Sequence, residues 1–154
     1  MKKSFILFGI ATAIVIAAPI GIAQEKAAKA KKSATGKTKE VVYMSSESAT
    51  YQEKFPGVSM AVVWGDPDKG AHGTFTKFVP GFDAKTHTHT NDVWIVVLKG
   101  AYLYRDEAGD KRVGPGEFIR IPGGHKHWSG GDPTEGALFY EEGSAKFDKI
   151  DVKQ

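Results

Sequence analysis

The sequence has no cysteine among its 154 residues. This absence excludes disulfide bonds, thiolate metal sites, iron–sulfur clusters and cysteine nucleophiles. Any metal site in this protein must therefore be built from His, Asp or Glu side chains.

Three well-defined motifs are also missing. The chain contains no Gly-x-Ser-x-Gly, no Gly-x-x-x-x-Gly-Lys-Ser/Thr and no Gly-x-Gly-x-x-Gly. Serine hydrolases with a nucleophile elbow, phosphate-loop enzymes and dinucleotide-binding proteins each depend on one of these patterns. The sequence thus argues against all three classes and leaves metal chemistry as the main candidate.

The N-terminus has the pattern of a secretory signal peptide. Lys2 and Lys3 precede an apolar stretch over residues 5–23, which ends in the small-residue triplet Gly21-Ile22-Ala23. Cleavage before Gln24 is expected, giving a signal peptide over 1–23 and a periplasmic or secreted protein with no integral membrane role after cleavage. The alternative is an uncleaved anchor, because about 20 apolar residues can cross a bilayer.

The next segment, 24–40, is rich in Lys, Ala, Ser and Thr. It is low in large apolar residues, which predicts a disordered spacer; its lysines alternatively predict a tether to a membrane surface. The remaining residues, 41–154, hold 13 Lys plus Arg against 16 Asp plus Glu, a net charge of −3. This part therefore has no basic face of the kind that binds nucleic acid.

From residue 41 the sequence consists of short runs rich in β-branched and aromatic residues, separated by turn residues. This texture predicts one all-β domain over 41–154, a sandwich or barrel. Segments rich in Gly, Pro or Asp, among them 107–110 and 129–133, predict turns. The predicted strands are 41–44, 58–64, 73–79, 93–98, 101–105, 117–121, 136–141 and 147–152.

Four of the five histidines form two close pairs, His87-Thr88-His89 and His125-Lys126-His127. Side chains two residues apart on a strand point to the same face, so such a pair can present two imidazoles to one ion. Neutral imidazole is a good ligand for Zn, Cu, Ni and Fe. A single His-x-His is weak evidence by itself, but the residues around these pairs add to it.

Those residues resemble the two motifs of the cupin superfamily, G(x)5HxH(x)3,4E(x)6G and G(x)5PxG(x)2H(x)3N. In this chain the matching positions are Gly81, His87, His89 and Gly100, then Gly116, Pro122, Gly124 and His127. The resemblance spans about residue 41 to the C-terminus, and the chain looks like small, single-domain, RmlC-like bacterial cupins of uncharacterised function. It implies a double-stranded β-helix, or jelly-roll barrel, with His87, His89 and His127 as metal ligands.

Two positions depart from the cupin pattern. Val93 stands where the family has a metal-binding glutamate, and Gly131 replaces the asparagine of the second motif. The expected ligand set is therefore three histidines and water, which leaves the ion its full positive charge and makes it a stronger Lewis acid. A decayed site is the alternative. Asp92 is a poor substitute, because alternation along the strand directs it away from the histidines.

Several other polar residues could contribute to the site. His125 is an additional candidate, as a fourth ligand, a proton shuttle or a hydrogen-bond donor behind the ligands, although an exposed loop residue is slightly favoured. His72 is expected to be a solvent-exposed turn residue. The carboxylates of Glu117, Glu141 and Glu142 are expected on solvated faces.

These patterns predict a metal-dependent cupin enzyme that acts on a small molecule, either through dioxygenase-like chemistry or through Lewis-acid chemistry. The cofactor is one divalent transition metal, with Fe, Zn, Ni, Mn and Cu all compatible with the ligands. A non-enzymatic module that binds or senses a metal or a small ligand is the alternative, because a fold alone does not specify a function. By analogy with other cupins, a homodimer is expected.

Overall fold

The computed structural model describes residues 41–153. The predicted signal peptide, 1–23, and the predicted spacer, 24–40, lie outside the described residues. Within 41–153 every regular element is a strand, so this range contributes no helix of the length and apolarity needed to cross a membrane.

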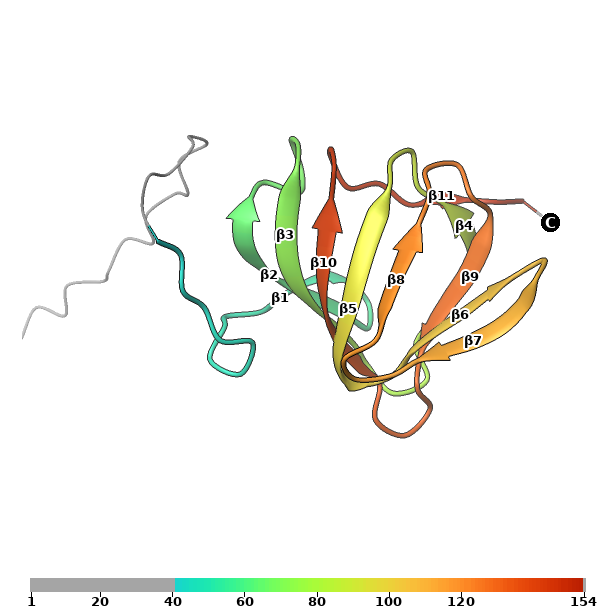
Figure 1. Cartoon of the computed structure of the whole chain (residues 1–154), viewed down its shortest axis with the longest axis horizontal. Helices are drawn as coiled ribbons and strands as arrows, with labels where there is room; N and C mark the ends of the chain where they lie inside the picture. The colour runs from blue at the N-terminus through green and yellow to red at the C-terminus, as the bar shows by residue number, and fades with distance from the viewer. Residues whose placement is uncertain (1–40, 154) are drawn as a thin grey trace, which may run out of the picture. The chain divides into compact units, whose positions relative to one another are not determined.

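The described part of the chain forms eleven strands (Figure 1). In chain order they are β1 (Gln52–Phe55), β2 (Val58–Gly65), β3 (His72–Phe78), β4 (Asp83–Thr88), β5 (Val93–Gly100), β6 (Tyr102–Asp106), β7 (Gly109–Val113), β8 (Phe118–Ile121), β9 (His127–Gly131), β10 (Ala137–Gly143) and β11 (Ile150–Asp151).

The strands form two antiparallel sheets that face each other. One sheet has the order β1-β2-β3-β10-β5-β8, and the other has the order β11-β4-β9-β6-β7. Strand β10 pairs with both β3 and β5, so the end of the chain returns to the middle of the first sheet. This arrangement confirms the predicted all-β jelly roll.

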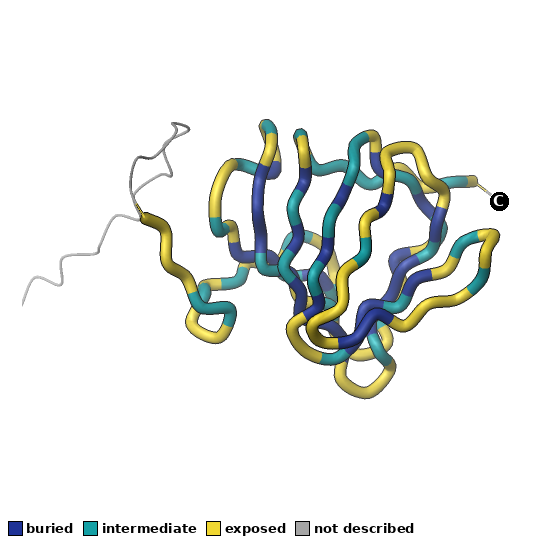
Figure 2. The backbone as a smooth tube through the Cα atoms, viewed as in Figure 1, coloured by how far each residue is buried: buried dark blue, intermediate teal, exposed yellow. Residues whose placement is uncertain are grey.

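The core lies between the two sheets. Alternate residues of β5, namely Val93, Ile95 and Val97, are buried, as is Phe139 of β10 (Figure 2). The Phe139 ring packs edge-on against the rings of Phe78 and Tyr102. Strand alternation thus places one apolar face of each sheet inside.

Several predicted boundaries were wrong. Residues 41–44 form no strand, and only Ile150–Asp151 of the range 147–152 is a strand; β1 and β4 fall outside the predicted ranges. The predicted turn over 107–110 is only two residues long, so β7 begins at Gly109. The predicted turn over 129–133 overlaps β9.

The glycines of β9 explain why a strand was mistaken for a turn. A Cβ atom on Gly130 would lie 2.6 Å from the carbonyl oxygen of Phe82, and one on Gly131 would lie 2.8 Å from that of Val79. These glycines therefore permit neighbouring backbones to approach closely, a role that glycine has in strands as well as in turns.

Candidate metal centre

The three predicted ligands lie on two neighbouring strands of the second sheet. His87 on β4 and His127 at the start of β9 are direct cross-strand partners, and His89 follows the last residue of β4. Residues directly opposite on paired strands share a face, and residues two apart on one strand do so as well. All three side chains are buried, with exposed fractions of 2% for His87, 7% for His89 and 1% for His127.

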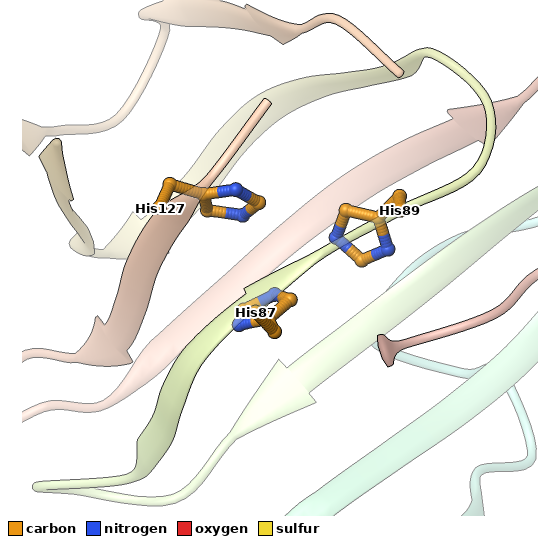
Figure 3. A group of neighbouring side chains, drawn as sticks. All are labelled: His87, His89 and His127. Atoms are coloured by element: carbon orange, nitrogen blue, oxygen red, sulfur yellow. The ribbon is translucent and has the colours of Figure 1, made fainter. Parts of the chain in front are cut away.

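The three imidazole rings form a compact group (Figure 3). The ring centroids of His87 and His127 are 4.4 Å apart, those of His87 and His89 are 4.9 Å apart, and those of His89 and His127 are 5.4 Å apart. One ring nitrogen of each residue lies within 4.8 Å of those of the other two. Two stretches of sequence nearly forty residues apart therefore meet at one point.

Each imidazole is oriented by a backbone carbonyl. The Nδ1 atoms of His87, His89 and His127 lie 2.8, 2.6 and 3.0 Å from the carbonyl oxygens of Lys85, Asp148 and His125, respectively. A carbonyl oxygen only accepts hydrogen bonds, so each Nδ1 carries the proton and donates it. The Nε2 atom of each ring is then left with a free lone pair, which is the form that binds a metal.

Burial keeps these histidines neutral. Loss of solvent around the ring lowers the pKa of His87 to about 4, and the same cause lowers the pKa values of His89 and His127 below their ordinary range. Charged histidines nearby would lower the pKa of His87 further. At neutral pH the three rings therefore do not need to lose a proton before they bind a cation.

A local distortion of β4 positions the carbonyl that orients His87. Lys85 has a φ of 61°, and the pairing of β4 with β9 shifts register between Asp83 and Thr86. The Asp83 carboxylate accepts hydrogen bonds from the backbone N–H and from Nζ of Lys85. This local hydrogen bonding supports a left-handed backbone conformation that is unfavourable for most residues other than glycine.

The ring of Tyr104 stacks on that of His127, with centroids 5.5 Å apart and planes inclined by 16°. The Tyr104 hydroxyl donates a hydrogen bond to Asp106 at 2.8 Å. Nε2 of His125 lies 3.1 Å from the same carboxylate, and the side chain of His125 is 42% exposed. The side chain of His125 therefore pairs with Asp106 and is not a member of the three-histidine group, to which His125 contributes its backbone carbonyl.

Val93 and Asp92 lie as strand alternation predicts. Val93 is buried in the core cluster of the barrel. The Asp92 carboxylate is engaged elsewhere: it pairs with Arg120 at 2.6 Å and accepts a hydrogen bond from the backbone N–H of Gly123. An apolar side chain thus occupies the interior position of the usual cupin glutamate.

The expectation for His72 was wrong. This residue begins β3 and is only 1% exposed, because its ring turns inward over Gly143 of β10. Its Nδ1 donates to the carbonyl oxygen of Gly70 at 2.9 Å, and its Nε2 has no hydrogen-bond partner among residues 41–153. The turn residues up to Gly70 suggested that His72 belongs to the turn, but His72 is the first residue of β3 and its side chain faces the interior.

The expectation for Glu141 was also wrong. Its side chain is 6% exposed and lies in the barrel interior, on the same face of β10 as Phe139. Alternation from the apolar Phe139, within a strand that the sequence did predict, was the signal that identifies Glu141 as inward-facing. Glu117 and Glu142, by contrast, do not belong to the buried set of side chains.

A cavity adjoins the histidines on the interior side. Its volume is about 40 Å³. Most of its wall is apolar, and its polar side chains are those of Thr76, His87, His89, Tyr102, Ser129, Glu141 and Lys149. The aromatic rings in that wall belong to Phe55, Phe78, Phe82, Tyr102 and Phe147.

The residues present fit a divalent transition metal. Nε2 of His127 is buried without a hydrogen-bond partner in the described part of the chain. An unpaired polar atom in a protein interior is costly, and a bound ion removes that cost. Three neutral imidazoles are a ligand set that Zn and other divalent transition metals accept.

Comparison with known proteins supports this description. The family model described as the ChrR cupin-like domain matches residues 39–147. No curated protein matches the chain. Among solved structures, the polyketide cyclase RemF from Streptomyces resistomycificus is similar, with a TM-score of 0.62 and 21% identity over 75% of this chain and 87% of that one.

Two further structures share the fold. KdgF from Halomonas sp. has a TM-score of 0.54 and 22% identity, over 66% of this chain and 93% of that one. The complex of SigE with the anti-sigma ChrR from Rhodobacter sphaeroides gives a TM-score of 0.53 and 17% identity, over 65% of this chain and 51% of that one. The family model covers most of the sequence, and the chain belongs to the ChrR cupin-like domain family of the cupin superfamily.

Proposed function

We propose that this protein binds one divalent transition metal through Nε2 of His87, His89 and His127, and that it acts on a small molecule held in the adjoining cavity. The observation that carries this proposal is the common orientation of the three rings. Each donates Nδ1–H to a backbone carbonyl and is thereby left with a free Nε2 beside the other two.

A divalent ion held by three neutral ligands supplies Lewis-acid chemistry, or redox chemistry with oxygen if the ion is iron. The chain itself supplies the surroundings. The aromatic wall of the cavity excludes water and orients an apolar ligand, while His87 and His89 face the same cavity. The carbonyls of Lys85 and Asp148 keep these two rings in place during any reaction.

Metal analysis of protein purified without a histidine tag tests the proposal. The wild type is expected to retain about one Fe, Zn, Ni, Mn or Cu ion per chain, and His87→Gln and His127→Gln are expected to retain none. His125→Gln is the matched control, because the His125 side chain pairs with Asp106 outside the three-histidine group, and it should retain the wild-type amount. Equal metal content in all four proteins would exclude this site.

A non-enzymatic binding module is the second candidate. Membership of the ChrR cupin-like domain family favours this candidate. The ChrR protein that was solved in complex with SigE is an anti-sigma protein, which is a binding role. Turnover assays on small aromatic and carbonyl compounds, with oxygen uptake recorded, separate the two candidates. Metal-dependent turnover supports the enzyme, and metal retention without turnover across the panel supports the module.

We also propose that the protein is exported, because residues 1–23 have the pattern of a cleavable signal peptide. The intact mass of the protein recovered from a bacterial periplasm tests this. A mature N-terminus at Gln24 is expected. Recovery of the full-length chain from the membrane fraction would instead indicate an anchor.

A further inference from the structure

The interior of the barrel contains a carboxyl group that the three-histidine site does not use. Glu141 faces inward from the middle of β10, with Thr74 of β3 and Ile95 of β5 opposite it on the two flanking strands. Its side chain is more than nine-tenths buried and lines the same cavity as His87 and His89. Glu141 and the histidines thus belong to opposite sheets and face one cavity.

This carboxyl group has no partner for one of its oxygens in the described part of the chain. Oε1 of Glu141 is buried and makes no hydrogen bond. The hydroxyl that lies across the strand, on Thr74, is paired at 3.1 Å with the hydroxyl of Thr76. Burying an unpaired carboxyl is unfavourable, and here it raises the pKa of Glu141 to about 7. The hydroxyls of Thr76, Tyr102 and Ser129 line the same cavity, but none of them is hydrogen-bonded to this oxygen, so a ligand that enters can supply the missing hydrogen bond.

The remaining walls indicate what can enter. Phe55, Phe78, Phe82 and Phe147 surround the space with aromatic rings, so most of a ligand's surface must be apolar. A ligand that reaches both sheets places one end near His87 and His89 and the other near Glu141. A carboxylate accepts hydrogen bonds, so the end near Glu141 should carry a donor.

We propose that Glu141 is a ligand-recognition residue, which accepts a hydrogen bond from the hydroxyl of a small, largely apolar ligand such as a phenol. The proposal builds on the proposed function, in which the other end of the ligand faces the metal-binding histidines. The Glu141 end of the site does not itself require the ion, because no metal ligand contributes to it. This independence makes the two proposals separable by experiment.

The experiment compares 4-fluorophenol with 4-fluoroanisole, which has the same ring but no O–H. Binding of each probe to the purified full chain is followed by ¹⁹F NMR. At pH 8, where Glu141 is mostly ionised and 4-fluorophenol is not, wild-type protein is expected to bind the phenol about tenfold more tightly than the ether, as for one hydrogen bond to a charged acceptor. Glu141→Gln is expected to weaken this preference, because its neutral amide oxygen is a poorer acceptor than a carboxylate. Glu142→Gln, a change at the next residue of the strand, is expected to keep it.

Further measurements distinguish the possible failures. His127→Gln removes a proposed metal ligand that does not line the cavity. This variant should lose the metal but still prefer the phenol over the ether. That result would support the role of Glu141 whether or not the metal site is correct. Glu141→Gln should retain metal and unfold at the same or a higher temperature than the wild type. Equal affinity of the wild type for the two probes would overturn the proposal. So would a lower unfolding temperature or loss of metal in Glu141→Gln, since Glu141 would then be a structural residue or a metal ligand.

Discussion

His89 and Asp148 are joined by a hydrogen bond of 2.6 Å, from Nδ1 to the backbone carbonyl, although they are 59 positions apart in the sequence. The carboxylate of Asp148 in turn accepts hydrogen bonds from the backbone N–H and the hydroxyl of Thr90. The segment between β10 and β11 is thus attached both to the ring of His89 and to the next residue, Thr90. The orientation of one proposed metal ligand depends on how firmly this segment is held.

We therefore expect Asp148→Ala to weaken metal binding without unfolding the barrel. The carbonyl remains, but the two bonds that fix it against Thr90 are lost, so the His89 ring is held less firmly. Loss of residues that orient metal ligands typically reduces affinity about 10- to 100-fold. Competition with a chromogenic chelator measures this change. Asp110→Ala, which breaks a surface ion pair with Arg105, is the control and should leave metal affinity unchanged.

Replacement of Val93 by glutamate should restore the usual carboxylate of the cupin pattern. Val93 is buried in the core cluster, so Val93→Glu should destabilise the metal-free protein by about 3 kcal/mol, because a buried charge is then left unpaired. Added metal should recover more stability in this variant than in the wild type, which thermal unfolding with and without metal will show. Val93→Met is the control, because methionine is similar in size to glutamate but has no oxygen that could bind the metal. Weaker metal retention in Val93→Glu would mean that position 93 does not face the ion.

The metal-free protein should lose stability as the pH falls from about 6.5 to about 4. Burial lowers the pKa of His87 to about 4 in the folded chain, whereas the unfolded chain takes up the proton near 6.5. The unfolded state therefore binds more protons than the folded state between pH 6.5 and pH 4. As a result, the free energy of unfolding decreases as the pH is lowered through this window. Urea titrations at several pH values should show a shallower acid loss in His87→Gln than in the wild type.

Glu141 should have the opposite effect of His87 on how the stability of the protein depends on pH. Burial raises its pKa from 4.5 to about 7 in the folded chain, so the folded state keeps a proton that the unfolded state releases. Its contribution to stability therefore decreases as the pH rises through this window. Glu141→Gln and wild type should differ little below pH 4.5, and above pH 7 the variant should be more stable by up to about 3 kcal/mol. A difference that does not vary with pH would contradict the raised pKa.

Gly143→Ala should disturb the buried ring of His72. A Cβ atom at position 143 would lie 2.4 Å from Cε1 of that ring, so either the ring or the strand must shift. Overpacking of this kind costs about 1 to 3 kcal/mol. Urea unfolding measures the cost, with Gly70→Ala as control, since a Cβ atom there meets nothing within 4 Å. A loss no greater than that of the control would show that the ring moves aside freely.

The sequence was sufficient to predict the fold and the three-histidine cluster. Short β-rich runs predicted an all-β domain, and two spaced motifs indicated that His87, His89 and His127 meet. The all-β class follows from the local pattern of strands and turns, whereas the jelly roll and the set of three histidines were implied by the resemblance to the cupin motifs. The motif glycines at 81, 100, 116 and 124 all have positive φ, a conformation that few other residues adopt.

Local patterns did not reveal where His72 and Glu141 lie, because their burial depends on long-range pairing. His72 is interior because β3 pairs with β10, some seventy residues further along the chain. A polar residue in the sequence is more often exposed than buried, and this prior favoured the wrong answer for both. Alternation outward from Phe139 would have placed Glu141 inside, but the usual exposure of carboxylates outweighed it.

The three carbonyls that orient the histidines have one further consequence. In many metal sites a carboxylate side chain performs this task, so that replacement of that side chain disrupts the site. Here the peptide backbone performs it, and every amino acid carries the same C=O group. Related proteins can therefore differ at positions 85 and 125 and still hold the imidazoles in the same tautomer. Searches that compare only residue identities will underestimate how widely this device is shared.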